Sequence, residues 1–288
     1  MHRIIKPLLF LLLALALTRP LSGQGTNDLA DMRWQPEGVT NPPNAAAFWF
    51  PVGEQLTYVV HWGVFKVAEA VVTTDWVRWK DGRLLLRIRY RTVSNKFIAS
   101  LYPVNDVIES YIDPATFLPV RFVKNMNEGS RHELAVTDFN HAKSTARWRK
   151  LVRNYHDWNL PIAPDIRDIP SLSYWLRKDG FTGNTTNQFA VMADDKIYKV
   201  TLALEDLNET IPIPDFGLVP ALKGHLDASF EGLFVRKGKV DLWVSKGAPC
   251  LILRIDAEVP VAKIKVRLST INGVGAEQWK TIWPAIDK

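Results

Sequence analysis

The stretch LLLRIRYR at residues 84–91 alternates apolar with basic side chains, and this alternation decides the fold. Successive side chains of a β-strand point to opposite faces of a sheet. A period of two therefore indicates a strand with one buried face and one solvated face. The same period runs through residues 56–62, 198–204 and 262–268. The sequence thus predicts several half-buried strands.

Turn sequences separate the predicted strands. KDGR at residues 80–83 predicts a hairpin turn because glycine tolerates the positive φ of a tight turn. Similar turns are expected at Lys237–Gly238 and Asp194–Asp195. Further strands are predicted over residues 64–76, 105–112, 118–126, 131–139, 188–193, 222–230, 240–245 and 250–256.

One segment, residues 170–179, predicts a short helix, with Pro170 in its first turn and Gly180 as its stop. Strands joined by short turns favour an antiparallel meander. A sheet of this length must curl, because unpaired edges promote aggregation. We therefore expect an all-β fold, a large antiparallel meander sheet curled into a barrel or half-barrel.

The first 25 residues read as a signal peptide. Arg3 and Lys6 give a basic start, residues 8–17 are apolar, and small residues follow at positions 22, 23 and 25. The apolar run is too short to span a bilayer, and no later run is longer, so we expect no integral membrane span after cleavage. These features predict a periplasmic or secreted protein.

The remaining chain divides into two predicted parts. Residues 26–49 are polar and interrupted by prolines, which predicts a disordered linker. Residues 50–288 are expected to form a single β domain.

The single cysteine, Cys250, excludes an intramolecular disulfide, and its apolar surroundings favour a small buried side chain.

Charge and motifs exclude several function classes. The chain has 36 basic and 30 acidic residues, and three of the basic ones lie in the leader. The remaining charges nearly balance, so the composition does not indicate nucleic-acid binding. The chain has neither a Gly-x-Ser-x-Gly nucleophile motif nor a histidine or cysteine pair at metal-ligand spacing. Its glycines do not form a phosphate-binding loop. We predict neither a cofactor nor a metal.

Aromatic residues offer one kind of candidate binding site. The chain has 11 tryptophans, whose large flat faces fill barrels, stack on sugar rings or line lipid pockets. Four aromatic residues in apolar strand or helix patterns are the candidate ligand-binding residues: Tyr58, Trp62, Trp175 and Trp243. Packing of the barrel interior is the alternative explanation for all four.

Basic residues offer a second candidate site. Two groups of three cations each share one strand face, namely Arg87, Arg89 and Arg91, and Lys263, Lys265 and Arg267. If the two strands are neighbours, the six cations line one surface that attracts anionic glycans or lipid headgroups. The alternative is a solvated outer face.

Four motifs, in order, resemble the DUF3108 family of exported bacterial proteins. FPVGEQLTY at residues 50–58 resembles its opening strand, and DVIESYID at 106–113 resembles its next block. DIPSLSYWLR at 168–177 is similar to its helix, and VDLWVS at 240–245 to a late strand. The resemblance implies an exported, barrel-like antiparallel β fold and no known reaction. Residues 246–249 and Ala68 depart from the family pattern.

Together these features favour a non-catalytic envelope protein that binds an apolar or glycan ligand, or an envelope partner. Two alternatives remain open. One is an envelope polysaccharide hydrolase that uses paired carboxylates, such as Asp106, Glu109 or Asp168. The other is a structural assembly factor that works through sheet edges. The sequence leaves the oligomeric state undetermined.

Overall fold

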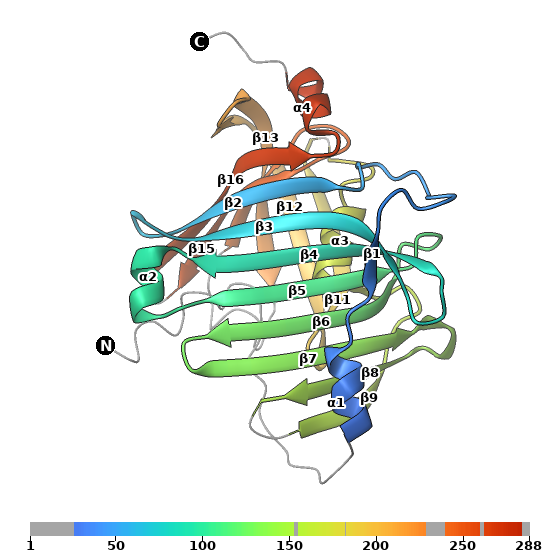
Figure 1. Cartoon of the computed structure of the whole chain (residues 1–288). Coiled ribbons are helices and arrows are strands. Elements are labelled where there is room, and N and C mark those ends of the chain that lie inside the picture. The colour runs from blue at the N-terminus through green and yellow to red at the C-terminus, as the bar shows by residue number, and fades with distance from the viewer. Residues whose placement is uncertain (1–25, 153–154, 182, 229–239, 260–261, 284–288) are drawn as a thin grey trace.

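Most strands pair with their neighbours in the chain, and together they form one curled sheet (Figure 1). The structure is a computed structural model that describes residues 26–152, 155–181, 183–228, 240–259 and 262–283. The signal peptide and the Lys237–Gly238 turn predicted from sequence lie outside these residues.

The first half of the chain supplies the helices and strands that face the viewer in Figure 1. These are α1 (Thr26–Arg33), β1 (Glu37–Val39), β2 (Glu54–Trp62), β3 (Phe65–Arg78), β4 (Leu84–Ser94), α2 (Lys96–Leu101), β5 (Asn105–Ile112), β6 (Pro119–Glu128), β7 (Arg131–Asn140), β8 (Thr145–Leu151) and β9 (Tyr155–Pro161).

The second half supplies the far wall and the internal helix. It comprises β10 (Arg167–Asp168), α3 (Ile169–Trp175), β11 (Thr185–Ala193), β12 (Lys196–Ile213), β13 (Gly217–Ala228), β14 (Val240–Ser245), β15 (Ile252–Val259), β16 (Ala262–Gly273) and α4 (Ala276–Ile282). A 3-10 turn, η2 (His141–Lys143), joins β7 to β8.

Strand order explains the shape of the sheet. From one edge to the other it runs β10 to β16 and then β2 to β9, and β1 pairs beside β3. The antiparallel pairing of β16 with β2 therefore joins the two ends of the meander. The break in the sheet falls between β9 and β10, which are consecutive in the chain but are not paired with each other. The sheet is thus an open half-barrel, which confirms the predicted fold class.

Side-chain hydrogen bonds bridge the break between β9 and β10, which no backbone pairing closes. Ser110 Oγ on β5 donates to Asp168 Oδ2 beside α3 at 2.6 Å. Lys124 Nζ on β6 donates to Asp194 Oδ2 in the β11–β12 turn at 2.6 Å. All four side chains are buried. Polar bridges inside the half-barrel therefore connect its two walls.

The two faces of the sheet differ in what covers them. The inner face holds the largest apolar cluster, in which Phe50, Trp76, Ile88, Tyr174 and Trp279 are buried. Helix α3 lies inside the curve of the sheet, behind β4 and β5 in Figure 1. On the outer face α1 covers a second cluster that includes Met32, Val77 and Val136.

Residues 26–49 differ from the linker expected from sequence, because α1 and β1 lie within them. Met32 is fully buried, and Asp31 accepts hydrogen bonds from Arg121 at 2.8 Å and from Arg149 at 2.9 Å. The polar composition of this segment supplies carboxylates for arginines on the outer face. Composition alone cannot distinguish this role from disorder.

Substitution of Gly180, which follows α3, tests how closely the chain after the helix packs against the backbone of Gly247. A Cβ at Gly180 would lie 2.2 Å from the carbonyl oxygen of Gly247, and its φ is +62°. Gly82 has a φ of +84°, and a Cβ there meets nothing within 4 Å. We expect Gly180→Ala to lower the free energy of unfolding by about 3 kcal/mol or more, and Gly82→Ala by about 1 kcal/mol. Urea unfolding measures both, and equal losses would contradict the packing described for Gly180.

Candidate functional site

Two of the family-like motifs, residues 50–58 and 168–177, meet at one buried ion pair inside the half-barrel. Arg177, which follows α3, donates from its two terminal nitrogens to the two carboxylate oxygens of Glu54 at the start of β2. Its Nε donates to the carbonyl oxygen of Cys250 at 3.1 Å. Glu54 is 1 % exposed and Arg177 is 5 % exposed. The pair therefore joins the helix to β2 and to the segment before β15.

Tyrosines surround this ion pair. The Arg177 guanidinium lies 4.6 Å from the ring centre of Tyr174. Tyr58 donates to the carbonyl oxygen of Ile252 at 3.0 Å, and the hydroxyls of Tyr90 and Ser173 are 2.8 Å apart. Burial raises the pKa of Tyr90 to about 12. These phenols therefore stay protonated and act as hydrogen-bonding groups.

The start of α3 is fixed by a capping box. Asp168 accepts from the backbone N–H of Ser171 at 2.8 Å, and the Ser171 hydroxyl lies 3.1 Å from the backbone nitrogen of Asp168. Burial raises the pKa of Asp168 to about 6. A capping aspartate of this kind satisfies backbone donors that would otherwise lack partners.

The carboxylates of the hydrolase hypothesis are not gathered around a common space. Glu109 and Ser110 are consecutive on β5, so they face opposite sides of the sheet. Ser110 binds Asp168 on the inner side, whereas Glu109 accepts from Arg89 Nε at 2.6 Å on the outer side. Asp106 accepts from the backbone N–H of Asn127 at 2.7 Å. Asp168 and Glu109 are therefore separated by the sheet and held in structural contacts.

The four predicted ligand-binding aromatics lie in different places. Tyr58 is beside the Glu54–Arg177 pair, and the Trp175 ring lies 4.5 Å from the guanidinium of Arg167. Trp243 is 6 % exposed, and its indole N–H donates to Glu209 at 2.5 Å. Trp62 packs beside the cluster that contains Val60 and Ile264. Their role in ligand binding stays a prediction.

Cys250 is 3 % exposed, and burial raises the pKa of its thiol to about 11. A thiol with so high a pKa is a poor nucleophile at neutral pH. Its backbone N–H donates to the carbonyl oxygen of Arg177 at 3.2 Å. Cys250 is therefore a small packed side chain beside the ion pair.

The six predicted cations share the outer face but do not form one patch. Strands β4 and β16 are not neighbours, because β2 and β3 lie between them. Arg87 and Arg89 bind the carboxylates of Asp75 and Glu109. Arg91 donates to Asn105 at 3.2 Å, and Lys263 lies within 3.8 Å of Asp256. Lys265 and Arg267 form no ion pair with any described residue.

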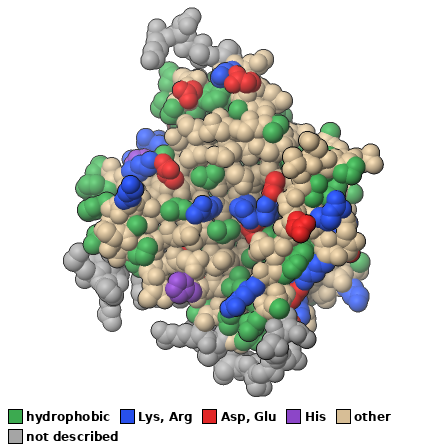
Figure 2. Space-filling model, viewed as in Figure 1, with side chains coloured by type: hydrophobic (Ala, Val, Ile, Leu, Met, Phe, Trp, Pro, Cys, Tyr) green, Lys and Arg blue, Asp and Glu red, His purple; other side chains and the backbone are tan. Residues whose placement is uncertain are grey.

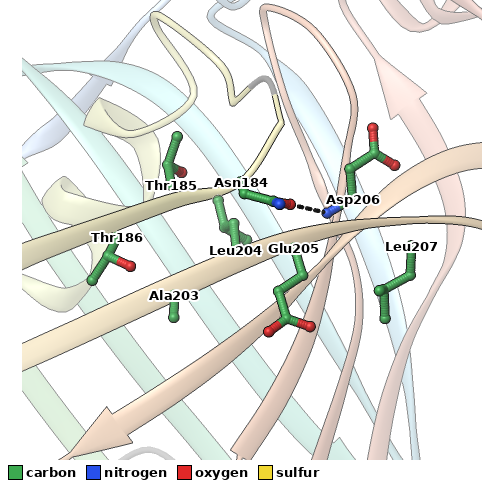
Figure 3. A pocket seen from close by; sticks show the side chains of 8 residues that line it. All are labelled: Asn184, Thr185, Thr186, Ala203, Leu204, Glu205, Asp206 and Leu207. Carbon is green, nitrogen blue, oxygen red and sulfur yellow. Dashed lines mark hydrogen bonds between the residues drawn. The ribbon is translucent and has the colours of Figure 1, made fainter.

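An open pocket lies on the far wall, where β11 begins and β12 bulges (Figure 3). Its volume is about 350 Å³. The register of β12 against β13 shifts between Glu205 and Glu209, so this part of β12 leaves the ladder. Asn184, Thr185, Thr186 and residues 203–207 line the pocket. Sequence patterns do not reveal it, because it results from a local break in pairing.

Within the pocket, neighbouring carboxylates have different surroundings. Glu205 forms no hydrogen bond or ion pair with any described residue. Asp206 binds Lys246 at 2.7 Å and accepts from the backbone N–H of Asn208 at 3.1 Å. Its backbone N–H donates to Asn184 at 2.8 Å, as drawn in Figure 3. The hydrogen bond from Lys246 lowers the pKa of Asp206. The pocket thus holds the unpaired carboxylate of Glu205 and the carboxylate of Asp206, whose charge is balanced by Lys246.

The part of the chain that the structure describes contains no group of three histidine, cysteine or acidic side chains that could hold a metal ion. Within the same residues, no helix has both the length and the apolar composition needed to cross a bilayer.

Removal of the Glu54–Arg177 pair tests its structural role. We expect Arg177→Met to lower the free energy of unfolding by about 3–5 kcal/mol, because it leaves the Glu54 carboxylate buried without its cation. The double variant Glu54→Met/Arg177→Met should regain much of this loss. Urea unfolding of the two single variants and the double variant measures the coupling. Additive losses would show that the two side chains act independently.

Asp106 makes stability depend on pH. Burial raises the pKa of this carboxyl to about 7, and its Oδ2 has no hydrogen-bond partner. The folded state therefore holds the proton more tightly than the unfolded state, so the contribution of Asp106 to stability falls as pH rises from about 4 to about 7. Asn accepts the same hydrogen bond from Asn127 without charge.

We expect Asp106→Asn to be more stable than the wild type at pH 8 by on the order of 1–3 kcal/mol, and nearly equal to it at pH 4. Thermal and urea unfolding at both pH values measure the difference. Asp81→Asn, in an exposed turn, is the control and should show no comparable pH dependence. A constant difference for Asp106→Asn at both pH values would contradict the assignment.

Comparisons with known proteins leave the function of the chain open. No curated protein matches the chain. Among solved structures, a beta-barrel-like protein of domain of unknown function DUF1849 from Brucella abortus aligns with 8 % identity and a TM-score of 0.47. That alignment covers 77 % of this chain and 98 % of the other. Residues 57–269 match the family described as "Protein of unknown function (DUF3108)". Because this match covers most of the sequence, the chain belongs to the DUF3108 family.

Proposed function

We propose that the protein is an exported, non-catalytic binding protein of the cell envelope that holds a glycan chain in the pocket between β11 and β12. The observation that carries the proposal is the composition of this pocket. It combines a free carboxylate, threonine hydroxyls and apolar side chains in an open space of about 350 Å³. Sugars offer hydroxyl groups to such acceptors and C–H faces to apolar side chains.

The arrangement of the pocket side chains suits an extended, hydroxyl-rich ligand. Ala203, Glu205 and Leu207 alternate along β12 and therefore share one face, and Ala203 pairs with Thr186 of β11. The Leu207 side chain is 52 % exposed. Glu205 thus lies between the apolar side chains of Ala203 and Leu207, and Thr186 lies opposite Ala203, so a sugar ring can meet polar and apolar groups together. The open side of the pocket leaves room for a chain to continue beyond it.

The same carboxylates argue against hydrolysis at this site. Glycoside hydrolysis uses two carboxyl groups roughly 5–10 Å apart across the bond, and one of them must keep a proton. Glu205 and Asp206 are adjacent on a strand and so face opposite sides. The ion pair with Lys246 also keeps Asp206 ionised. A binding role therefore fits this pocket better than the hydrolase alternative.

The test is saturation-transfer NMR with a panel of neutral oligosaccharides, followed by titration calorimetry of any that bind. We expect Glu205→Gln and Thr186→Val each to weaken binding about tenfold, the effect of losing one or two hydrogen bonds. Glu37→Gln, on the exposed strand β1, is the control and should bind like the wild type.

Two results would contradict the proposal. One is the absence of binding by the wild type across the panel. The other is binding that neither pocket variant changes. Release of new reducing ends from the oligosaccharides, lost in Glu205→Gln, would favour the hydrolase alternative instead.

A further inference from the structure

Four large apolar side chains are exposed at one rim of the half-barrel. Val64 is 86 % exposed, Phe65 70 %, Phe97 73 % and Leu101 60 %. Val64 lies in the β2–β3 turn and Phe65 begins β3, whereas Phe97 and Leu101 lie four residues apart on α2 and so share one side of the helix. We call these four residues the apolar rim. Single exposed apolar residues are common, but a group of this size points to an interaction surface.

The turn and the helix of the apolar rim are fixed to each other. The Asn95 side chain caps α2 by accepting from the backbone N–H of Ile98 at 2.8 Å. The same side chain donates to the carbonyl oxygen of Lys66, and the Asn95 backbone N–H donates to that of Val67 at 2.9 Å. Ile98 packs inward against the cluster that contains Val67. Figure 1 shows α2 at the same end of the sheet as the β2–β3 turn. The apolar rim is therefore presented by ordered structure.

Cations adjoin the apolar rim on its outer side. His61 is the register partner of Lys265 on β16 and of Lys66 on β3. Desolvation and the nearby charges of Arg267, Lys66 and Lys265 lower the pKa of His61, which agrees with a shared positive field. The Gly63 N–H donates to the carbonyl oxygen of Lys263 at 2.9 Å, so β16 starts directly beside the turn. We call Lys66, Lys263, Lys265 and Arg267 the basic collar.

The basic collar is only partly neutralised within the protein. Lys66 pairs with Glu69 at 2.5 Å, and Lys263 lies 3.6 Å from Glu258, on exposed side chains. Lys265 and Arg267 lack an ion pair among the described residues. Figure 2 shows hydrophobic side chains grouped at the left edge of the molecule, where Figure 1 places α2, with basic side chains and a histidine just above them. Exposed apolar tips beside unpaired cations match the acyl boundary and the acidic headgroups of a bilayer.

We propose that the apolar rim and the basic collar dock the protein on the surface of an anionic lipid bilayer. The apolar side chains enter the interfacial layer and the cations contact acidic headgroups. A protein partner would need an acidic and apolar surface of matching shape, whereas a bilayer supplies both features at any point. This inference is independent of glycan binding, because the pocket lies on the far wall of the sheet.

The test is co-sedimentation of the protein, as recovered after export, with two kinds of vesicle. One contains phosphatidylcholine alone, and the other equal parts of phosphatidylcholine and phosphatidylglycerol. We expect binding to the anionic vesicles only, and weakening of that binding as salt screens the charges. Phe65→Ser/Phe97→Ser and Lys265→Glu/Arg267→Glu should each reduce the partition coefficient about tenfold or more.

Matched controls lie at the opposite rim. Leu218→Ser/Ile282→Ser removes two exposed apolar side chains, and Arg78→Glu/Lys280→Glu reverses two exposed cations. Both should bind like the wild type. All the substituted side chains except the half-buried Lys265 are exposed, and thermal unfolding of each variant checks that it is folded. Absence of vesicle binding, equal binding to both vesicles, or equal loss in rim and control variants would overturn the proposal. Loss confined to the rim and collar variants would support it.

Discussion

Buried charge holds the two walls of the half-barrel together. The sheet does not close through a backbone ladder between β9 and β10. Lys124 binds Asp194 across the break and Glu133 on the neighbouring strand β7. Arg177, just after α3, binds Glu54. Removing one partner from such a pair leaves an uncompensated buried charge. The open topology is therefore tolerated because side chains supply the contacts that a closed barrel would obtain from its ladder.

This constraint explains why the family-like motifs carry no evident chemistry. Glu54 lies in one of these motifs and Asp168 and Arg177 lie at the two ends of another, and all three hold α3 in place. Each is engaged by a partner within the protein, and the Asp168 carboxylate caps the helix. Their role is to fix the helix inside the sheet. The two proposed binding functions therefore use surfaces outside this cluster, namely the pocket at β12 and the apolar rim.

Much of the fold could be predicted from local patterns. The alternation at 84–91 identifies β4, and the KDGR turn identifies the hairpin that precedes it. Pro170 and Gly180 bracket α3 and the turns after it. These features depend on neighbours in the sequence, where side-chain periodicity and turn conformations act. The position of the break in the sheet depends on the pairing of β16 with β2, which joins distant segments that no local pattern relates.

The candidate sites were harder to predict, because they too depend on pairing between segments that are distant in the sequence. Arg87 and Arg89 suggested a free basic surface, but Asp75 and Glu109 on the adjacent strands β3 and β5 neutralise them. The basic collar instead takes Lys66 from β3 and three residues from β16. Phe65 and Phe97 showed no pattern in sequence, because their exposure depends on where the turn and α2 meet. The pocket likewise depends on a bulge whose position follows from pairing with β13.

The most direct test of the central claim is native-state hydrogen exchange of the amides in and after α3. Leu176 donates to Leu172 within the helix, and Cys250 donates to the carbonyl oxygen of Arg177. If buried charge fixes α3 inside the half-barrel, these amides exchange only through global unfolding, with the same free energy of opening as amides in β2 and β16. Exchange through a local opening of much lower free energy, while β2 and β16 stay protected, would contradict the account.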